Sequence, residues 1–260
     1  VKSDEQKTKT KTNTKTKKKR MLPQDFRVLQ ASEYEKMNEY CYEIKFVLDE
    51  SSYSDALQWL YVCTNAVNRY PDRYINTIYL DNPDYESVRD NLAGVSERVK
   101  TRIRWYDGDP IVKLEKKIRK GRLVRKETTP LDLGEDFSSE LSPLALRNRI
   151  NNILYNKTEL NDDYYESILG VRYLRKYFED QVGFRVTFDE KIQFSDLYDD
   201  NNSFPLSNGL IDYNQKIMEI KFNPSKKDYV ANLVKKLNMT PKRHSKYLVG
   251  MAHLGNVVYI

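Results

Sequence analysis

One short stretch of the sequence places four positive side chains in alternation. Residues 98–109 read RVKTRIRWYDGD, in which Arg98, Lys100, Arg102 and Arg104 alternate with small or apolar residues. In a β-strand such residues lie on one face, with successive members about 7 Å apart. At an effective dielectric constant of about 20, each neighbouring pair repels by about 2 kcal/mol. The chemistry that this pattern predicts is the binding of an anion with several charges.

Carboxylates are mixed with the cations at a regular spacing. The pattern Glu-x-Lys occurs at 43–45, 115–117 and 219–221. A carboxylate among cations either holds a divalent metal that contacts phosphate oxygens or pairs with the neighbouring lysine. Each charged face could equally be the solvated side of an antiparallel sheet. The repetition of Lys and Arg over several predicted strands favours a polyanion site. The charged strand faces comprise Lys45, Lys100, Arg102, Arg104, Lys113, Lys117, Arg185, Lys221, Glu43, Glu115, Asp189 and Glu219.

Strands are the main elements expected to position these residues. Alternation of polar and apolar residues predicts strands at 42–48, 74–81, 98–106, 171–178, 184–192 and 216–222, and two more between 111 and 127 that are broken at Gly121. Helices are predicted at 53–70, 143–156, 225–239 and 245–254. In the first of these, Ser54 is the predicted cap and Pro71 the predicted end. With apolar faces packed on helices, the charged faces must curl around a wet cavity.

Composition separates a tail from a globular part. Residues 1–20 hold nine Lys or Arg and two acidic residues, which leaves 35 basic and 36 acidic residues among the other 240 of the 260. We expect 1–20 to be a disordered Lys/Thr-rich tail and 21–260 to be one domain. Cys41 and Cys63 lack metal-ligand spacing, so a reduced compartment is expected and a zinc site is not. No membrane span or signal peptide is evident, and the predicted location is cytoplasmic.

Several of these segments together resemble a known family. The segments are YEIKFVL (42–48), IRWY (103–106), LEKK (114–117), RVTFD (185–189), MEIKF (218–222) and HSKY (244–247). In this order they resemble the polyphosphate polymerase domain of the VTC (vacuolar transporter chaperone) proteins, in the triphosphate tunnel metalloenzyme or CYTH-like superfamily. The resemblance spans about Tyr40 to His253.

The resemblance implies an α+β fold, in which an antiparallel β-barrel forms a triphosphate tunnel and helices pack outside it. It also implies a divalent metal, Mn²⁺ or Mg²⁺, and transfer of the terminal phosphate of ATP onto a polyphosphate chain. By motif, the residues implied to act on phosphate are Lys45, Arg102, Arg104, Lys117, Arg175, Arg185 and Lys246. Those assigned to substrate binding are Lys100, Lys126, Lys221 and Arg243. Glu219 is implied as the metal carboxylate, with Glu43 and Glu115 as helpers.

The sequence departs from the superfamily pattern at one wall position. The first acidic residue of the superfamily's ExExK strand is replaced by Cys41, so one charge of the tunnel wall is missing. The basic residue three positions before Lys246 is retained as Arg243.

Three alternatives to a polymerase are compatible with these residues. A hydrolase of tripolyphosphate or nucleoside triphosphates would need the same cations. A non-catalytic polyphosphate-binding subunit would keep them without turnover. Binding of nucleic acid through the Lys-rich tail is not expected, because the remainder of the chain is nearly neutral. The sequence contains no GxxxxGK[ST] or GxGxxG motif, so it does not predict a P-loop or Rossmann nucleotide site.

Overall fold

The protein is described by a computed structural model. The residues described are 40–107, 111–132, 143–155, 165–197, 210–255 and 257. All of them belong to the compact unit Met37–Ile260. The predicted tail at 1–20 lies outside the described residues, as do residues 108–110 between two of the predicted strands.

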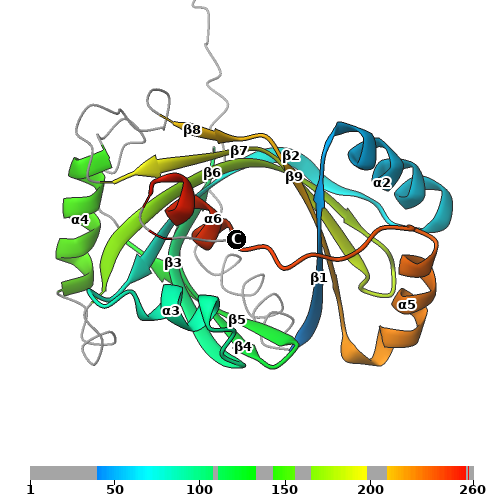
Figure 1. The fold of residues 1–260 in the computed structure, drawn as a ribbon, viewed down its shortest axis with the longest axis horizontal. Coiled ribbons are helices and arrows are strands. Elements are labelled where there is room, and N and C mark those ends of the chain that lie inside the picture. Colours follow the sequence, from blue (N-terminus) through cyan, green and yellow to red (C-terminus); the bar gives the residue numbers. More distant parts are fainter. Residues whose placement is uncertain are drawn as a thin grey trace, which may run out of the picture. The chain divides into compact units, whose positions relative to one another are not determined.

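Nine antiparallel strands form one sheet that closes on itself. The strands are β1 (Cys41–Leu48), β2 (Val67–Asp81), β3 (Glu97–Tyr106), β4 (Val112–Lys120), β5 (Leu123–Leu131), β6 (Glu166–Glu179), β7 (Arg185–Asp196), β8 (Ile211–Tyr213) and β9 (Lys216–Phe222). Their order is β6-β2-β3-β4-β5-β1-β9-β7-β8, and β6 also pairs with β7. That last pairing closes eight strands into a ring, with β8 attached to β7 (Figure 1).

The strand faces follow the predicted alternation. In β3, Ile103 is completely buried in the outer core, whereas Arg102 and Arg104 lie on the opposite face. Gly121 makes the turn between β4 and β5 with a φ of +59°, a left-handed conformation that glycine adopts without strain. The predicted fold class, an antiparallel barrel with helices outside, is therefore confirmed.

Helices cover the apolar outer face on two sides (Figure 1). On one side they are α2 (Glu50–Cys63) and α5 (Lys227–Lys235), with a 3-10 turn η2 at Pro224–Lys226 before α5, and on the other side α4 (Pro143–Tyr155). Two more helices, α3 (Glu86–Leu92) and α6 (Lys246–His253), belong to a separate buried cluster, in which Tyr247 of α6 stacks on Tyr79 of the cavity lining. Leu146, Ile150 and Leu154 recur every four residues in α4 and form its buried stripe against β2 and β3. The indole of Trp59 in α2 donates to the carbonyl of Leu233 in α5 at 2.9 Å and joins the two helices.

The helix predicted at 53–70 begins three residues earlier, at Glu50. Asp49, not Ser54, is the N-cap, because its carboxylate accepts a hydrogen bond from the backbone N–H of Ser52 at 2.8 Å. The Ser52 hydroxyl in turn accepts from the backbone N–H of Asp49 at 2.9 Å, which completes a capping box. The sequence contains this signal as DESS at 49–52, in which Asp49 and Ser52 form the capping box.

The end of that helix is also wrong, because the chain becomes extended after Cys63. β2 begins at Val67, and Pro71 lies within it rather than ending a helix. A proline cannot donate to a strand ladder, and the pairing of β2 with β6 is irregular between Tyr70 and Arg73, around this residue. The last predicted helices are also shorter, since 225–239 contains only η2 and α5.

Candidate functional site

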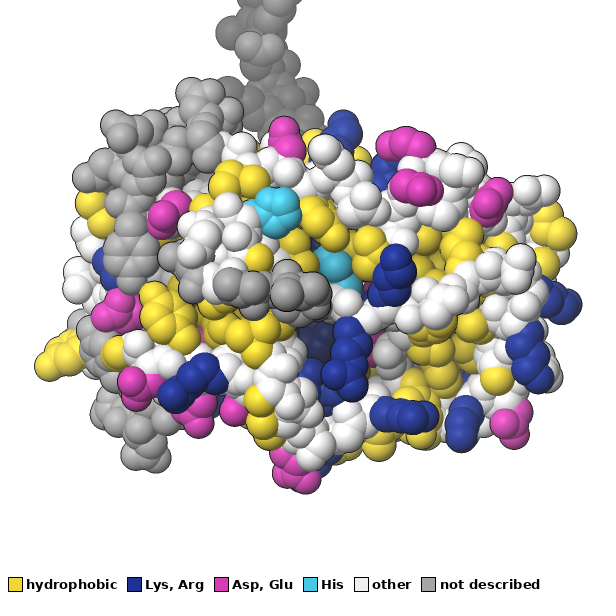
Figure 2. Space-filling view, in the orientation of Figure 1, with side chains coloured by type: hydrophobic (Ala, Val, Ile, Leu, Met, Phe, Trp, Pro, Cys, Tyr) yellow, Lys and Arg dark blue, Asp and Glu magenta, His cyan; other side chains and the backbone are white. Residues whose placement is uncertain are grey.

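The ring encloses a cavity with a volume of about 1050 Å³. Figure 2 shows Lys and Arg side chains gathered in a hollow near the middle of one face. Of the predicted site residues, those that line the cavity are Glu43, Lys45, Lys100, Arg102, Arg104, Lys117, Arg175, Glu219, Lys221, Arg243 and Lys246. They come from β1, β3, β4, β6 and β9, from α6 and from the segment before α6. The strand parity seen in the sequence therefore brings these charges together.

Glu115 anchors one group of cations from β4. Its side chain is completely buried and lies 2.7 Å from the Arg102 guanidinium, 3.5 Å from that of Arg104 and 2.7 Å from the Lys126 ammonium. Burial alone would raise the pKa of Glu115, but the two arginines and Lys126 outweigh it and hold that pKa well below its ordinary value. Because Glu115 is completely buried and does not line the cavity, it fits a positioning role better than the predicted metal role.

The two arginines that contact Glu115 differ in how many of their N–H groups remain available to a ligand. Arg104 also donates to the Thr77 hydroxyl at 3.2 Å and the Tyr173 hydroxyl at 3.0 Å, so its guanidinium is held on three sides. Arg102 donates to Glu115 through Nε and Nη2. Its Nη1 makes no hydrogen bond or ion pair to any residue that the structure describes. Arg102 therefore presents donors to the cavity while its other edge is fixed.

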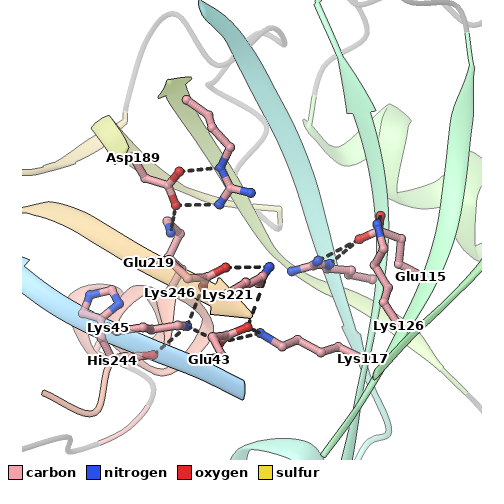
Figure 3. A network of polar contacts seen from close by, with 12 residues as sticks. Glu43, Lys45, Glu115, Lys117, Lys126, Asp189, Glu219, Lys221, His244 and Lys246 are labelled. Atoms are coloured by element: carbon pink, nitrogen blue, oxygen red, sulfur yellow. Dashed lines mark hydrogen bonds and ion pairs between the residues drawn. The ribbon is translucent and has the colours of Figure 1, made fainter. Parts of the chain in front are cut away.

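Asp189 on β7 anchors a second pair of cations. It is completely buried, accepts two hydrogen bonds from Arg175 at 2.5 and 2.8 Å, and contacts the Lys246 ammonium at 2.5 Å (Figure 3). Burial would raise its pKa, but Arg175 and Lys246 lower the pKa to about 2. The sequence pattern places Asp189 on a charged strand face but assigns it no role in the site. The signal that could have found it is its position in RVTFD, where it shares a strand face with Thr187.

Glu43 and Glu219 form a third group with three lysines (Figure 3). Lys45 lies 3.2 Å from Glu43 and 3.3 Å from Glu219, and Lys221 lies 2.6 Å from Glu219. Lys117 of β4 donates to both oxygens of Glu43 at 2.8 and 2.7 Å. Despite that contact, burial and the neighbouring lysines lower the pKa of Lys117 to about 8.

Lys100 is the one lysine among the predicted site residues that lacks a carboxylate partner within the described part of the chain. Its ammonium donates to the hydroxyl of Ser245 at 2.8 Å, and Ser245 is the N-cap of α6. Burial lowers the pKa of Lys100 well below its ordinary value, and the charges of Lys45 and Lys117 lower it further. The positive charge of Lys100 is therefore buried without a neutralising carboxylate, and a bound anion would stabilise it.

Three predicted site residues do not line the cavity. Two of them are Glu115 and Lys126, which contact each other; Glu115 also contacts Arg102 and Arg104, which do line the cavity. Arg185 is exposed at the first position of β7, opposite Lys221 of β9. Its place at the end of the strand puts it at the edge of the ring, away from the clamp, by which we mean the cavity-lining cations Lys45, Lys100, Arg102, Arg104, Lys117, Arg175, Lys221 and Lys246. Arg243, which does line the cavity, is also exposed.

The carboxylates suit a divalent metal that is shared with a phosphate ligand. The described residues contain no group of three or more His, Cys, Asp or Glu side chains that could hold a metal. Mg²⁺ is commonly bound through one or two protein carboxylates together with substrate phosphate oxygens. Glu219 and Glu43 both line the cavity and supply hard oxygen donors of this kind. The donor set therefore fits such a metal, with Glu219 and Glu43 as its protein ligands.

Similar solved structures share the fold. A Hippeastrum protein, studied as an adenylyl cyclase and described as having a dominant triphosphatase activity, gives a TM-score of 0.50 at 14% identity, covering 85% of this chain and 97% of that chain. A Pyrococcus horikoshii protein gives 0.47 at 13% identity, covering 82% and 99%. An adenylate cyclase candidate from Vibrio parahaemolyticus gives 0.46 at 11%, covering 80% and 97%. The likeness to the Hippeastrum structure shows a shared fold, the closed antiparallel barrel.

The family follows from the sequence profile of the VTC domain, which matches residues 27–255. The chain belongs to the VTC domain family. No curated protein matches the chain. Among the described residues, no helix is both long enough and apolar enough to cross a membrane.

Proposed function

We propose that this domain is a metal-dependent phosphotransferase of the polyphosphate polymerase type, which moves the terminal phosphate of ATP onto a polyphosphate chain. The observation that carries the proposal is the excess of cations in an enclosed cavity. Among the described residues that line it, the carboxylates are Glu43 and Glu219, and the predicted cations are Lys45, Lys100, Arg102, Arg104, Lys117, Arg175, Lys221, Arg243 and Lys246. Membership of the VTC family supports the same assignment.

The cations are held in place before a ligand binds. Each anchoring carboxylate contacts residues of at least two elements, as when Asp189 of β7 holds Arg175 of β6 and Lys246 of α6. Phosphoryl transfer needs in-line positioning and positive charge on the non-bridging oxygens, and little covalent help from the protein. Arg102 and Arg175 supply planar donors with one edge fixed, and the lysines supply point charges.

The proposed transfer needs no general base. The terminal oxygen of a phosphate chain is already an anion near neutral pH. It attacks the γ-phosphorus of ATP, the bond from that phosphorus to the bridging oxygen breaks, and ADP leaves with the electron pair. Mn²⁺ or Mg²⁺, when bound at Glu219 and Glu43, supplies charge neutralisation for the phosphate oxygens. Hydrolysis would differ only in having water in the attacking position.

The deciding experiment is a product assay with ATP and Mn²⁺ or Mg²⁺. Formation of long-chain polyphosphate and ADP is the expected result. Release of orthophosphate alone would replace the polymerase with a hydrolase, and binding of polyphosphate without turnover would make the domain a binding subunit.

Glu219→Gln tests the metal role within the same assay. The variant keeps the size of the side chain but removes a charge that otherwise contacts Lys45 and Lys221. We expect metal-dependent turnover to collapse, while metal-free triphosphate binds as tightly as before or more tightly. Turnover within a few-fold of the parent would show that Glu219 only neutralises lysines.

A further inference from the structure

The far end of the barrel lumen holds an arginine that the proposed mechanism does not use. Arg73 of β2 is the direct cross-strand partner of Arg175 of β6. Cross-strand partners point to the same side of a sheet, so Arg73 shares the face of Arg175, which lines the cavity. The cavity lining includes Arg104 of β3 but not Tyr106 two residues later. Arg73 lies against that tyrosine, beyond the clamp.

Tyrosine rings surround the Arg73 guanidinium. Its central carbon lies 4.2 Å from the ring centre of Tyr106, 5.4 Å from that of Tyr177 and 5.9 Å from that of Tyr70. Stacking on an aromatic face leaves the N–H groups of a guanidinium available around its edge. The Nε of Arg73 is buried and makes no hydrogen bond to any residue that the structure describes, while the Arg73 guanidinium lies close enough to the Tyr177 hydroxyl to act on the pKa of that tyrosine.

No acidic side chain that the structure describes forms an ion pair with Arg73. Its cross-strand neighbour Arg175 is already neutralised by Asp189, and the nearby Asp107 is engaged by Arg172 at 2.6 Å and by Asn76 at 2.7 Å. Like charges placed directly opposite each other destabilise a sheet. An arginine kept opposite another arginine, without a carboxylate, indicates a place for an anion.

A second cation lies on the same tyrosine. The Lys113 ammonium of β4 is 5.7 Å from the Tyr106 ring centre, and Lys113 is the direct cross-strand partner of Arg104. Within the described ranges Lys113 also has no ion pair to a carboxylate. Arg73 and Lys113 are therefore two half-buried cations on one aromatic ring, at the end of the lumen that lies past the clamp.

From this geometry we infer that Arg73 and Lys113 form a distal anion site, which binds phosphate groups of a chain that extends past the clamp. The inference rests on the proposed function, since it takes the clamp residues to hold phosphate. A chain already bound at the clamp reaches the distal site at high effective concentration. Long chains thus gain contacts that triphosphate is too short to make. The distal site sets a preference for long polyphosphate over triphosphate.

The test compares the affinities of tripolyphosphate and long-chain polyphosphate, measured by calorimetry without metal. Arg73→Gln removes one charge-assisted contact, so we expect the affinity for the long chain to fall about tenfold while that for tripolyphosphate stays within about twofold of the parent. Lys113→Gln should act in the same direction if Arg73→Gln fails to fold. The matched control is Arg69→Gln, which removes an exposed arginine from the same strand and should change neither affinity.

The possible results distinguish failure of the distal site from failure of the proposed function. If Arg73→Gln and Lys113→Gln leave long-chain affinity unchanged while the parent still makes polyphosphate, the distal site is wrong and the proposed function stands. An equal loss for both ligands would also overturn it, since the effect would then be general electrostatics or misfolding. A parent that binds neither ligand would refute both proposals.

Discussion

Replacing Glu115 by Gln tests whether the clamp is held in place by carboxylates. The side chain of Glu115 is completely buried and contacts three cations, two of which have side chains that are themselves no more than 12% exposed. Removing one partner of a buried ion pair costs about 3–5 kcal/mol, because the remaining charges are left without compensation. Gln keeps the shape of the side chain, so the loss reports the charge. We expect the free energy of unfolding, measured with urea, to fall by that amount.

A ligand should reverse part of this loss. In the parent, Glu115 competes with phosphate for Arg102 and Arg104. Without that carboxylate the two arginines have only the ligand to neutralise them. We expect tripolyphosphate to bind Glu115→Gln about tenfold more tightly than the parent, which corresponds to about 1.4 kcal/mol of additional stabilisation at saturation.

Glu127→Gln is the matched control for this experiment. Glu127 of β5 contacts Arg125 at 2.6 Å, a distance similar to those around Glu115, but its side chain is 46% exposed. Exposed ion pairs contribute about 0–1 kcal/mol, so this variant should lose less than about 1 kcal/mol. Equal losses for the two variants, or a Glu115→Gln variant as stable as the parent, would refute the preorganised clamp.

Two further outcomes concern pH and packing. The pKa of Lys100 is lowered well below 10.5, so the unfolded chain binds its proton more readily, and the free energy of unfolding should rise with pH up to about 10.5. Lys100→Met should make that rise shallower between about pH 7 and about pH 9, and an unchanged slope in urea unfolding would contradict this. At Gly250, an added Cβ would lie 2.6 Å from Leu169 and 2.7 Å from Phe194. Gly250→Ala should therefore cost about 1–3 kcal/mol despite better helix propensity, and an equal or higher Tm would show that α6 can shift freely.

The clamp could be predicted from the sequence because strand parity is a local property. Arg102 and Arg104 alternate with apolar residues in an unbroken strand, so their shared face follows from two-residue periodicity alone. The same argument placed Glu43 with Lys45 and Glu219 with Lys221. Their meeting in one cavity required the sheet to curl, which we inferred from the apolar faces packed on helices, and the family resemblance then specified a closed barrel.

The rest depended on features that have no local period. Arg73 was given no face because the strand was predicted to begin at residue 74, whereas β2 pairs with β6 without a break from Arg73 to Thr77. Asp189 faces the lumen by parity, but its role as an anchor depends on Lys246, which lies 57 residues away in the chain. The helix predicted through residue 70 failed because Asp49 and Thr64 cap the helix earlier, and helix periodicity does not register a cap at that point.

The ring is not equally strong at every seam. β1 pairs with β9 through seven consecutive residues, but with β5 through only Cys41 and Tyr42. Beyond those two residues, the gap is bridged by the Lys117 to Glu43 contact inside the lumen. We expect bending of the barrel to concentrate at the β1–β5 pairing, because fewer backbone hydrogen bonds hold those two strands together than hold β1 to β9. If a polyanion in the lumen draws Lys117 away from Glu43, the contact next to the β1–β5 pairing is lost. We therefore expect the barrel to widen at this pairing when the lumen fills.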